Sequence, residues 1–190
     1  YFLQYMNDAL ELYKNEEQVM HISGYFFPVD TTGLPDTFFY NQASCWGWGT
    51  WRRGWATYRD DPTALLRELV NTEQVQAFDF DGNYPYTAML KSQAEGRKDS
   101  WAVRWYASAF LAGKLTLYPN KSLVVNAGLE GSGTHGGDSS FLTELASEPV
   151  AVTAQEPTEN QRARHAFEKF FKMSRHGLWN RVQVLVRGFL

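Results

Sequence analysis

Four tryptophans fall within ten positions of the chain, and this segment restricts the possible folds more than any other. Residues 44–55 read SCWGWGTWRRGW, with tryptophan at positions 46, 48, 51 and 55. A tryptophan buries a large area, but its indole N–H needs a hydrogen-bond partner when it is buried. Leucine or valine would give a core the same burial without that demand. The segment therefore predicts either an irregularly shaped core or a flat surface on which a ring-shaped ligand stacks.

The size and the cysteine content narrow the class of protein. The chain has 190 residues, of which 44% are hydrophobic, and this is enough for one good core. A single cysteine, Cys45, excludes an intrachain disulfide and a cysteine-based zinc site. No apolar run approaches the ~18 residues that a membrane span needs. The first residues carry acids and no basic region of a signal peptide, so we expect a cytoplasmic protein.

Hydrophobic spacing predicts an α/β fold. Steps of three and four residues predict helices at 1–14, 62–76 and 100–113. Runs rich in β-branched and aromatic residues predict strands or extended chain at 18–29, 37–42 and 115–128. Pro62 suits the first turn of its helix and Gly113 the end of another. In the helix at 62–76 the buried stripe is expected to hold Leu65, Leu66, Leu69 and Val70.

The charge is divided unevenly along the chain. Residues 161–190 hold seven Lys or Arg against one acid, a net charge of +6, which leaves −9 of the total −3 for the rest. An acidic body without a basic stripe argues against nucleic-acid binding. Residues 143–160 are rich in Ala, Glu, Pro and Thr and are interpreted as a linker, followed by a basic helical tail at 161–190.

The tail carries an apolar stripe with two alternative interpretations. The stripe either packs on the domain or lies in a membrane interface, where anionic lipid would attract the arginines. The second alternative makes the protein peripheral at the inner membrane, and deletion of 161–190 would then leave the body folded. The stripe consists of Leu178, Val182, Leu185, Val186 and Phe189.

Four segments occur in an order that resembles a known family. HISGYFFPV, FFYNQASCWGWGTWRRGW, KDSWAVRWYAS and LTLYPNKSLVVNAGLEGSGTH follow one another as in a bacterial family of GT-A-fold, family-2-like sugar transferases. The chain is similar, more distantly, to the N-acetylglucosaminyltransferase of the N-glycan pathway. The resemblance covers residues 1 to about 137. It implies that residues 1–142 form the acceptor-side, C-terminal half of a GT-A domain.

The resemblance also implies a nucleotide-binding half that precedes this one. In the family, an acidic motif of the Asp-x-Asp type lies just before the first helix and holds a divalent metal on the donor diphosphate. The helix expected here begins at Tyr1 without a capping residue, as if cut from a longer chain. We therefore expect Mn²⁺ or Mg²⁺ only together with that motif, and we expect the chain alone to be inactive.

The activity that the resemblance implies is inverting transfer of a sugar from a nucleotide sugar to a glycan or lipid-linked acceptor, in polysaccharide or glycoconjugate biosynthesis. This chemistry needs a carboxylate to deprotonate the acceptor hydroxyl, and positive charge for the departing diphosphate. The carboxylates near the aromatic region are Asp79, Asp81, Glu95 and Asp99.

Asp99 is the preferred base among these carboxylates. The related eukaryotic motif places its base in Asp-Asp-Trp, although the second Asp of that pair falls on Ser100 here. The alternative is that Asp99 only caps the following helix. The DFDG segment at 79–82 has the form of a metal motif, but it follows the aromatic segment, and Asp81-Gly82 predicts an ordinary turn.

Two histidines receive different interpretations. His135 lies in the glycine-rich GSGTHGG segment and is either solvated or, as the resemblance implies, a ligand of the metal or diphosphate. The loop at 128–137 is then expected to become ordered over the donor. His21 lies in an apolar strand and is expected to be a core histidine.

The resemblance further implies that the Trp-Gly segment lines the floor where donor sugar and acceptor meet. Trp48 and Trp51 are expected to be mostly structural, with Trp46 and Gly47 closer to the reacting groups. A carbohydrate-binding module would use the same aromatic surface with no base and no metal. A glycoside hydrolase would need two carboxylates flanking one bond, and it ranks third. The substrate-binding candidates are Trp46, Gly47, Trp48, Trp101 and Arg104.

Overall fold

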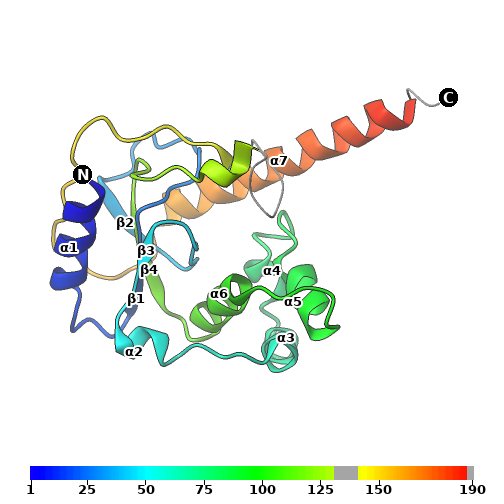
Figure 1. Cartoon of the computed structure of the whole chain (residues 1–190), viewed down its shortest axis with the longest axis horizontal. Helices are drawn as coiled ribbons and strands as arrows, with labels where there is room; N and C mark the ends of the chain where they lie inside the picture. The colour runs from blue at the N-terminus through cyan, green and yellow to red at the C-terminus, as the bar shows by residue number, and fades with distance from the viewer. Residues whose placement is uncertain (131–140, 188–190) are drawn as a thin grey trace.

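A mixed β-sheet lies at the centre of the molecule (Figure 1). The computed structural model describes residues 1–130 and 141–187. Within them the sheet has four strands in the order β2-β4-β1-β3. The β1–β4 pair is parallel, whereas β3 pairs with β1 and β2 pairs with β4 in the antiparallel sense. The strands are β1 (Val19–Ser23), β2 (Thr37–Tyr40), β3 (Trp48–Gly49) and β4 (Leu115–Pro119).

The helices predicted from hydrophobic spacing are present. The helices of the first part of the chain are α1 (Phe2–Leu12), α2 (Arg52–Trp55), α3 (Pro62–Asn71) and α4 (Val75–Phe78). They are followed by α5 (Tyr86–Ala94), α6 (Trp101–Leu111), a 3-10 turn at Ala127–Glu130 and α7 (Gln161–Arg187). The α/β class is thereby confirmed. No helix among the described residues is long and apolar enough to cross a membrane.

Both faces of the sheet are covered, which explains why β1 and β4 are buried along their whole length. Tyr5, Met6 and Ala9 of α1 pack on one face, against side chains of β1 and β4. The other face packs against α6 near β1 and against α7 near β2. In β2 the alternation is regular, because Phe39 joins the α1 side while Phe38 and Tyr40 join the α7 side.

Two details differ from the sequence prediction. Val70 is exposed, and the buried stripe of α3 is formed by Leu65 and Leu69, one turn apart on the same face. The extended segments at 18–29 and 115–128 form strands only over their first halves, Val19–Ser23 and Leu115–Pro119. Beyond these points the chain leaves the sheet and forms the loops at the carboxyl ends of the parallel pair.

The segment predicted as a linker runs along the body and is attached to it by hydrogen bonds. The Tyr13 hydroxyl donates to the carbonyl of Thr153 (3.2 Å), and the Gln155 side chain donates to Thr37 Oγ1 (2.9 Å). The Asn160 amide donates to the carbonyl of Phe39 (2.8 Å). Asn160 Oδ1 then accepts from the Ala163 amide (2.9 Å), which caps the start of α7.

The first turns of α7 belong to the core. Ala163, Phe167 and Phe171 are buried, at positions four residues apart on one face of the helix. The Phe167 ring stacks on Tyr40, with 4.7 Å between ring centroids. This part of the tail packs on the domain, but it contains no residue of the apolar stripe, so both alternatives for the stripe stay open. The far end of α7 extends away from the body (Figure 1), and the side chains of the stripe from Leu178 onward lie outside the description.

Candidate functional site

Four tryptophans meet beside the sheet at the start of α6. Trp48 comes from β3, Trp55 from α2, and Trp101 and Trp105 lie one turn apart on α6. The ring centroid of Trp48 lies 5.5 Å from Trp101 and 5.6 Å from Trp105, and Trp55 lies 5.2 Å from Trp105. Trp105 is fully buried, whereas Trp55 is 43% and Trp101 41% exposed. We call Trp48, Trp55 and Trp101 the tryptophan platform.

A glycine allows the platform to form. The short helix α2 packs against β1 at Gly54, where a Cβ atom would lie 2.9 Å from the carbonyl oxygen of Met20. Real side chains do not tolerate such an approach to backbone, so only glycine fits here. Trp55 follows directly and is placed over Trp105 by this contact. The sequence Arg-Arg-Gly-Trp thus positions the Trp55 indole of the platform.

His21 lies beneath the platform and accepts a hydrogen bond from the buried indole N–H of Trp105. Trp105 Nε1 donates to His21 Nδ1 (3.0 Å), and the His21 ring stacks on Trp48 with 5.0 Å between centroids and 3° between planes. Because Nδ1 accepts, the proton of the neutral ring is on Nε2, which has no partner within the described residues. Burial lowers the pKa of His21 to about 3. The prediction of a core histidine is confirmed, and its imidazole supports both Trp48 and Trp105.

This buried imidazole predicts a specific pH dependence of stability. In the unfolded chain His21 takes up a proton as the pH falls below about 6.5, whereas in the folded chain it stays neutral down to about 3. The unfolded state binds more protons in this window, so stability falls on acidification, by about 1.4 kcal/mol per pH unit from this residue. Urea unfolding between pH 7 and pH 4 measures the slope.

The matched variants for this prediction are His21→Gln and His165→Asn. Glutamine keeps an acceptor for Trp105 but does not titrate, so the slope should decrease by about one proton in His21→Gln. His165 is exposed, and its replacement should leave the slope unchanged. Equal slopes in wild type and His21→Gln would show that His21 does not couple folding to protonation.

Charged side chains border the platform at the start of α6. Arg104 Nη2 donates to Asp99 Oδ1 (2.8 Å), and Arg104 Nε lies 3.5 Å from Asp60 Oδ1. Tyr58 donates to the same Asp60 oxygen (2.9 Å), and its ring stacks on Trp55 at 4.8 Å and 6°. The Asp99 side chain is 87% exposed and that of Arg104 only 15%. A continuous set of contacts therefore joins the platform to an exposed carboxylate.

The capping alternative for Asp99 is wrong. The N-cap of α6 is Ser100, and no side chain makes a capping hydrogen bond at that position. The hydrogen bond of Asp99 goes to Arg104 instead, one turn into the helix. The carboxylate is thus held over the first turn of α6 and remains accessible to solvent.

Each of the other three carboxylates is already bonded to a neighbouring residue. Asp79 Oδ1 accepts from the amide (2.7 Å) and the hydroxyl (2.9 Å) of Thr87 at the start of α5, and its burial raises its pKa although these bonds act against the rise. Asp81 lies in the predicted turn, with φ values of 50°, 58° and 75° at residues 80, 81 and 82, and bonds to Gln76. Glu95 pairs with Arg97. The turn at DFDG is confirmed.

The four tryptophans of the 44–55 segment divide among three environments. The Trp46 ring packs edge-on against Tyr25 (4.6 Å) and Phe141 (6.1 Å) and has no ring contact with the platform among the described residues. Gly47, at φ +55°, reverses the local alternation, and a Cβ there would meet Val124 at 2.7 Å. Trp51 donates to the carbonyl of Leu10 (3.0 Å) and is structural, as predicted. Trp48 packs against the core and stacks on His21, as expected of a structural residue, and it also joins Trp55 in the platform.

Three residues of this site were not identified from the sequence: Trp55, Tyr58 and Asp60. Their signal was the continuation of the Trp-rich segment into TYRDD, where an aromatic and two acids follow the last tryptophan. The predicted residues Trp48, Trp101, Arg104 and Asp99 are brought together. His135 and most of the loop at 128–137 lie outside the described residues.

Among the residues that the structure describes, no three His, Cys, Asp or Glu side chains gather in a way that could hold a metal ion. The divalent metal expected from the resemblance thus has no fitting ligand set in this part of the chain. Comparison of the chain with protein-family models, curated proteins and solved structures found no match.

Proposed function

We propose that this chain forms the acceptor-side half of a GT-A-type glycosyltransferase, which transfers a sugar from a nucleotide sugar to a glycan or lipid-linked acceptor with inversion. The observation that carries the proposal is the exposed Asp99 carboxylate beside the half-exposed indoles of Trp55 and Trp101. Indole faces suit the C–H face of a sugar ring, and an adjacent carboxylate suits the removal of a proton from its hydroxyl. The motif order described above supplies the reaction class.

In the proposed reaction Asp99 acts as general base. The acceptor hydroxyl oxygen forms the new bond to the anomeric carbon while its proton passes to the carboxylate of Asp99. The bond from the anomeric carbon to the donor phosphate oxygen breaks, and its electron pair leaves with the nucleoside diphosphate. One carboxylate is enough for this displacement, unlike the two that a hydrolase needs.

Arg104 is better suited to hold Asp99 than to bind substrate. Its side chain is 15% exposed and faces the carboxylates of both Asp99 and Asp60. The Tyr58 hydroxyl fixes Asp60, and Tyr58 itself stacks on Trp55. These contacts orient Asp99 relative to the platform, which makes Arg104 and Asp60 positioning residues in the proposed mechanism.

The leaving diphosphate needs positive charge close to its oxygens. In the proposal the metal would come with the acidic motif of the nucleotide-binding half, where Mn²⁺ or Mg²⁺ neutralises phosphate charge when bound. The described residues offer no fitting ligand set.

A carbohydrate-binding module is the second candidate, favoured by one observation. The indoles of Trp55 and Trp101 are half-exposed in the free chain. They form a stacking surface without any contribution from Asp99 or from a donor. The two candidates separate at Asp99. A module binds glycan equally well with aspartate or asparagine there and transfers nothing.

Truncation of the platform tests the sugar-binding part that both candidates share. We expect Trp101→Ala and Trp55→Ala each to weaken sugar binding by about tenfold, since each removes a large apolar face from the contact. Methyl glycosides of glucose, galactose and N-acetylglucosamine, titrated at millimolar concentration against ¹⁵N-labelled chain, report binding through the indole N–H signals.

The matched control is Trp51→Phe. Trp51 packs under α1 and bonds to Leu10, so this change should alter stability without altering affinity. Equal losses of affinity in Trp51→Phe and Trp101→Ala would contradict the platform as a sugar site. So would sugar-induced shifts that appear elsewhere but not at the indole signals of Trp55 and Trp101.

A further inference from the structure

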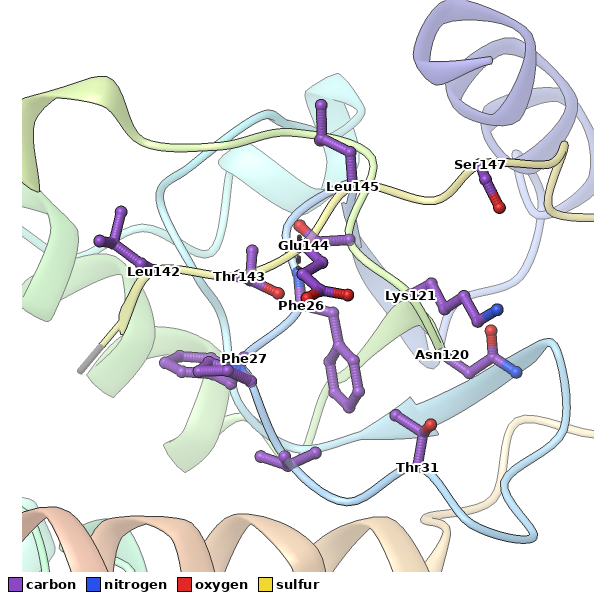
Figure 2. A pocket seen from close by; sticks show the side chains of 13 residues that line it. Phe26, Phe27, Thr31, Asn120, Lys121, Leu142, Thr143, Glu144, Leu145 and Ser147 are labelled. Atoms are coloured by element: carbon purple, nitrogen blue, oxygen red, sulfur yellow. Dashed lines mark hydrogen bonds between the residues drawn. The ribbon is translucent and has the colours of Figure 1, made fainter. Parts of the chain in front are cut away.

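A second hollow lies at the carboxyl ends of β1 and β4 and shares no residue with the tryptophan platform (Figure 2). Its volume is about 640 Å³, within the range of roughly 300–1,000 Å³ typical of small-molecule sites. Three chain segments form it: 26–31 after β1, 120–122 after β4, and 142–147. Ligands of open α/β sheets commonly bind outside the carboxyl ends of parallel strands, and β1 and β4 are the parallel pair here.

Ser122 ties the three segments together, so the pocket is formed without a ligand. Ser122 Oγ accepts from the Phe26 amide (3.0 Å) and donates to the carbonyl of Val124 (2.7 Å). Its carbonyl accepts from the Ala146 amide (2.8 Å), which fixes the third segment. The start of that segment is held as well, because the Tyr25 hydroxyl donates to the carbonyl of Phe141 (2.7 Å).

The lining combines apolar surface with uncommitted polar groups. The rings of Phe26 and Phe27 lie at the inner side, and Asn120, Lys121, Thr31 and Glu144 surround them (Figure 2). Within the described residues, none of these four polar side chains has a hydrogen-bond or ion-pair partner. They offer a donor-only ammonium, an acceptor-only carboxylate, and an amide and a hydroxyl that do both.

We propose that this pocket binds a sugar residue of the glycan acceptor, at a distance from the hydroxyl that reacts; the proposal rests on the proposed function. Sugar hydroxyls donate and accept, so they match a lining that presents both kinds of group. The charges of Lys121 and Glu144 cancel, which favours a neutral ligand over a phosphate or a cation. Four polar side chains around the hollow disfavour an acyl chain, because they would be desolvated without partners.

A short path of contacts joins the pocket to the platform. Gly24 donates to the carbonyl of Gly47 (2.7 Å), which precedes Trp48 of the platform. Phe26, two residues after Gly24 in the chain, lines the pocket. Between them, Tyr25 packs against Trp46. Trp46, a substrate-binding candidate without a ring contact to the platform among the described residues, therefore packs on the segment that leads from β1 to the pocket.

Amide shifts of ¹⁵N-labelled chain, titrated with the same methyl glycosides, test the proposal. Saturable shifts at residues 120–122 and 144–146 are expected, and Lys121→Ala and Glu144→Gln should each weaken them by about tenfold, the effect of removing a hydrogen bond to a charged group. The matched controls are Lys91→Ala and Glu148→Gln, exposed residues that do not line the pocket. Their affinities should equal that of wild type.

The possible results separate this proposal from the proposed function. Pocket shifts whose affinity falls in Lys121→Ala and Glu144→Gln but is unchanged in Trp101→Ala establish an independent sugar site. Shifts at the Trp55 and Trp101 indoles alone overturn the pocket and leave the proposed function intact. Shifts at neither place, with any of the glycosides, overturn both. If the affinity falls equally in the pocket variants and in their controls, the proposal that the pocket binds a sugar is also overturned.

Discussion

Replacing Asp99 with asparagine, in a polypeptide that joins this chain to a nucleotide-binding half, is expected to lower turnover by about 10²–10⁴-fold. Asparagine keeps the size of the side chain and an oxygen for Arg104, but it cannot accept the proton of the acceptor hydroxyl. Donor binding should change little, because in the proposed mechanism Asp99 contacts the acceptor and not the donor. Steady-state kinetics measure turnover, and calorimetric titration of the nucleotide sugar measures donor binding.

Three further variants give this prediction its controls. Asp81→Asn should behave as wild type, since Asp81 lies in a turn and bonds to Gln76. Ser100→Ala should also be mild, because Ser100 makes no capping hydrogen bond. Arg104→Gln should lower kcat without raising KM if Arg104 positions Asp99, whereas a substrate ligand would raise KM. A larger loss at Asp81 than at Asp99 would overturn the assignment of the base.

Replacing Phe167 with alanine is expected to destabilise the chain by about 3–5 kcal/mol, the usual cost of a cavity of this size in a core. Phe167 is fully buried in the packed part of α7. Its ring contacts Phe26 (5.6 Å), Tyr40 (4.7 Å) and Phe80 (6.0 Å), which come from three different parts of the chain. Urea unfolding followed by far-UV circular dichroism measures the free energy of unfolding.

Met173→Ala is the matched control, since Met173 is exposed on the same helix and its loss should change stability by no more than about 0.5 kcal/mol. If both variants lose the same stability, α7 does not contribute to the core. For the same reason, deletion of 161–190 is expected to unfold the body, contrary to the expectation for a membrane anchor. Truncation after residue 174 is the change that tests lipid binding by the far end of α7, in flotation with anionic vesicles.

Much of the secondary structure was predictable because it depends on local periodicity. The spacing of apolar residues located α1, α3 and α6, and the β-rich runs located β1, β2 and β4. His21 was recognised as a core residue from its apolar neighbours. The turn at DFDG followed from Asp-Gly, whose backbone tolerates positive φ. Each of these inferences uses neighbours within one or two turns of the chain.

The candidate site was predictable only in part. The order of motifs indicated Asp99, Trp101, Arg104 and Trp48, which the fold brings to the start of α6. Trp55, Tyr58 and Asp60 were missed, because their role depends on how α2 packs against β1 at Gly54. The resemblance implied that Trp46 lies nearer the reacting groups than Trp48, but the positive φ of Gly47 between them breaks the alternation of a strand, and Trp48 is the one that joins Trp55 and Trp101.

The sequence by itself determined which segments become helix or strand, that the chain has no intrachain disulfide, and which acids lie near the aromatic region. The tertiary structure alone decided which indoles are exposed, which carboxylates are already bonded, and that residues 141–160 and the start of α7 complete the body. Periodicity shows that Phe167 and Tyr40 each have a buried face, but not that the two faces meet. Such pairings depend on long-range packing, because many partners satisfy the same apolar pattern and only close packing of the whole core selects one.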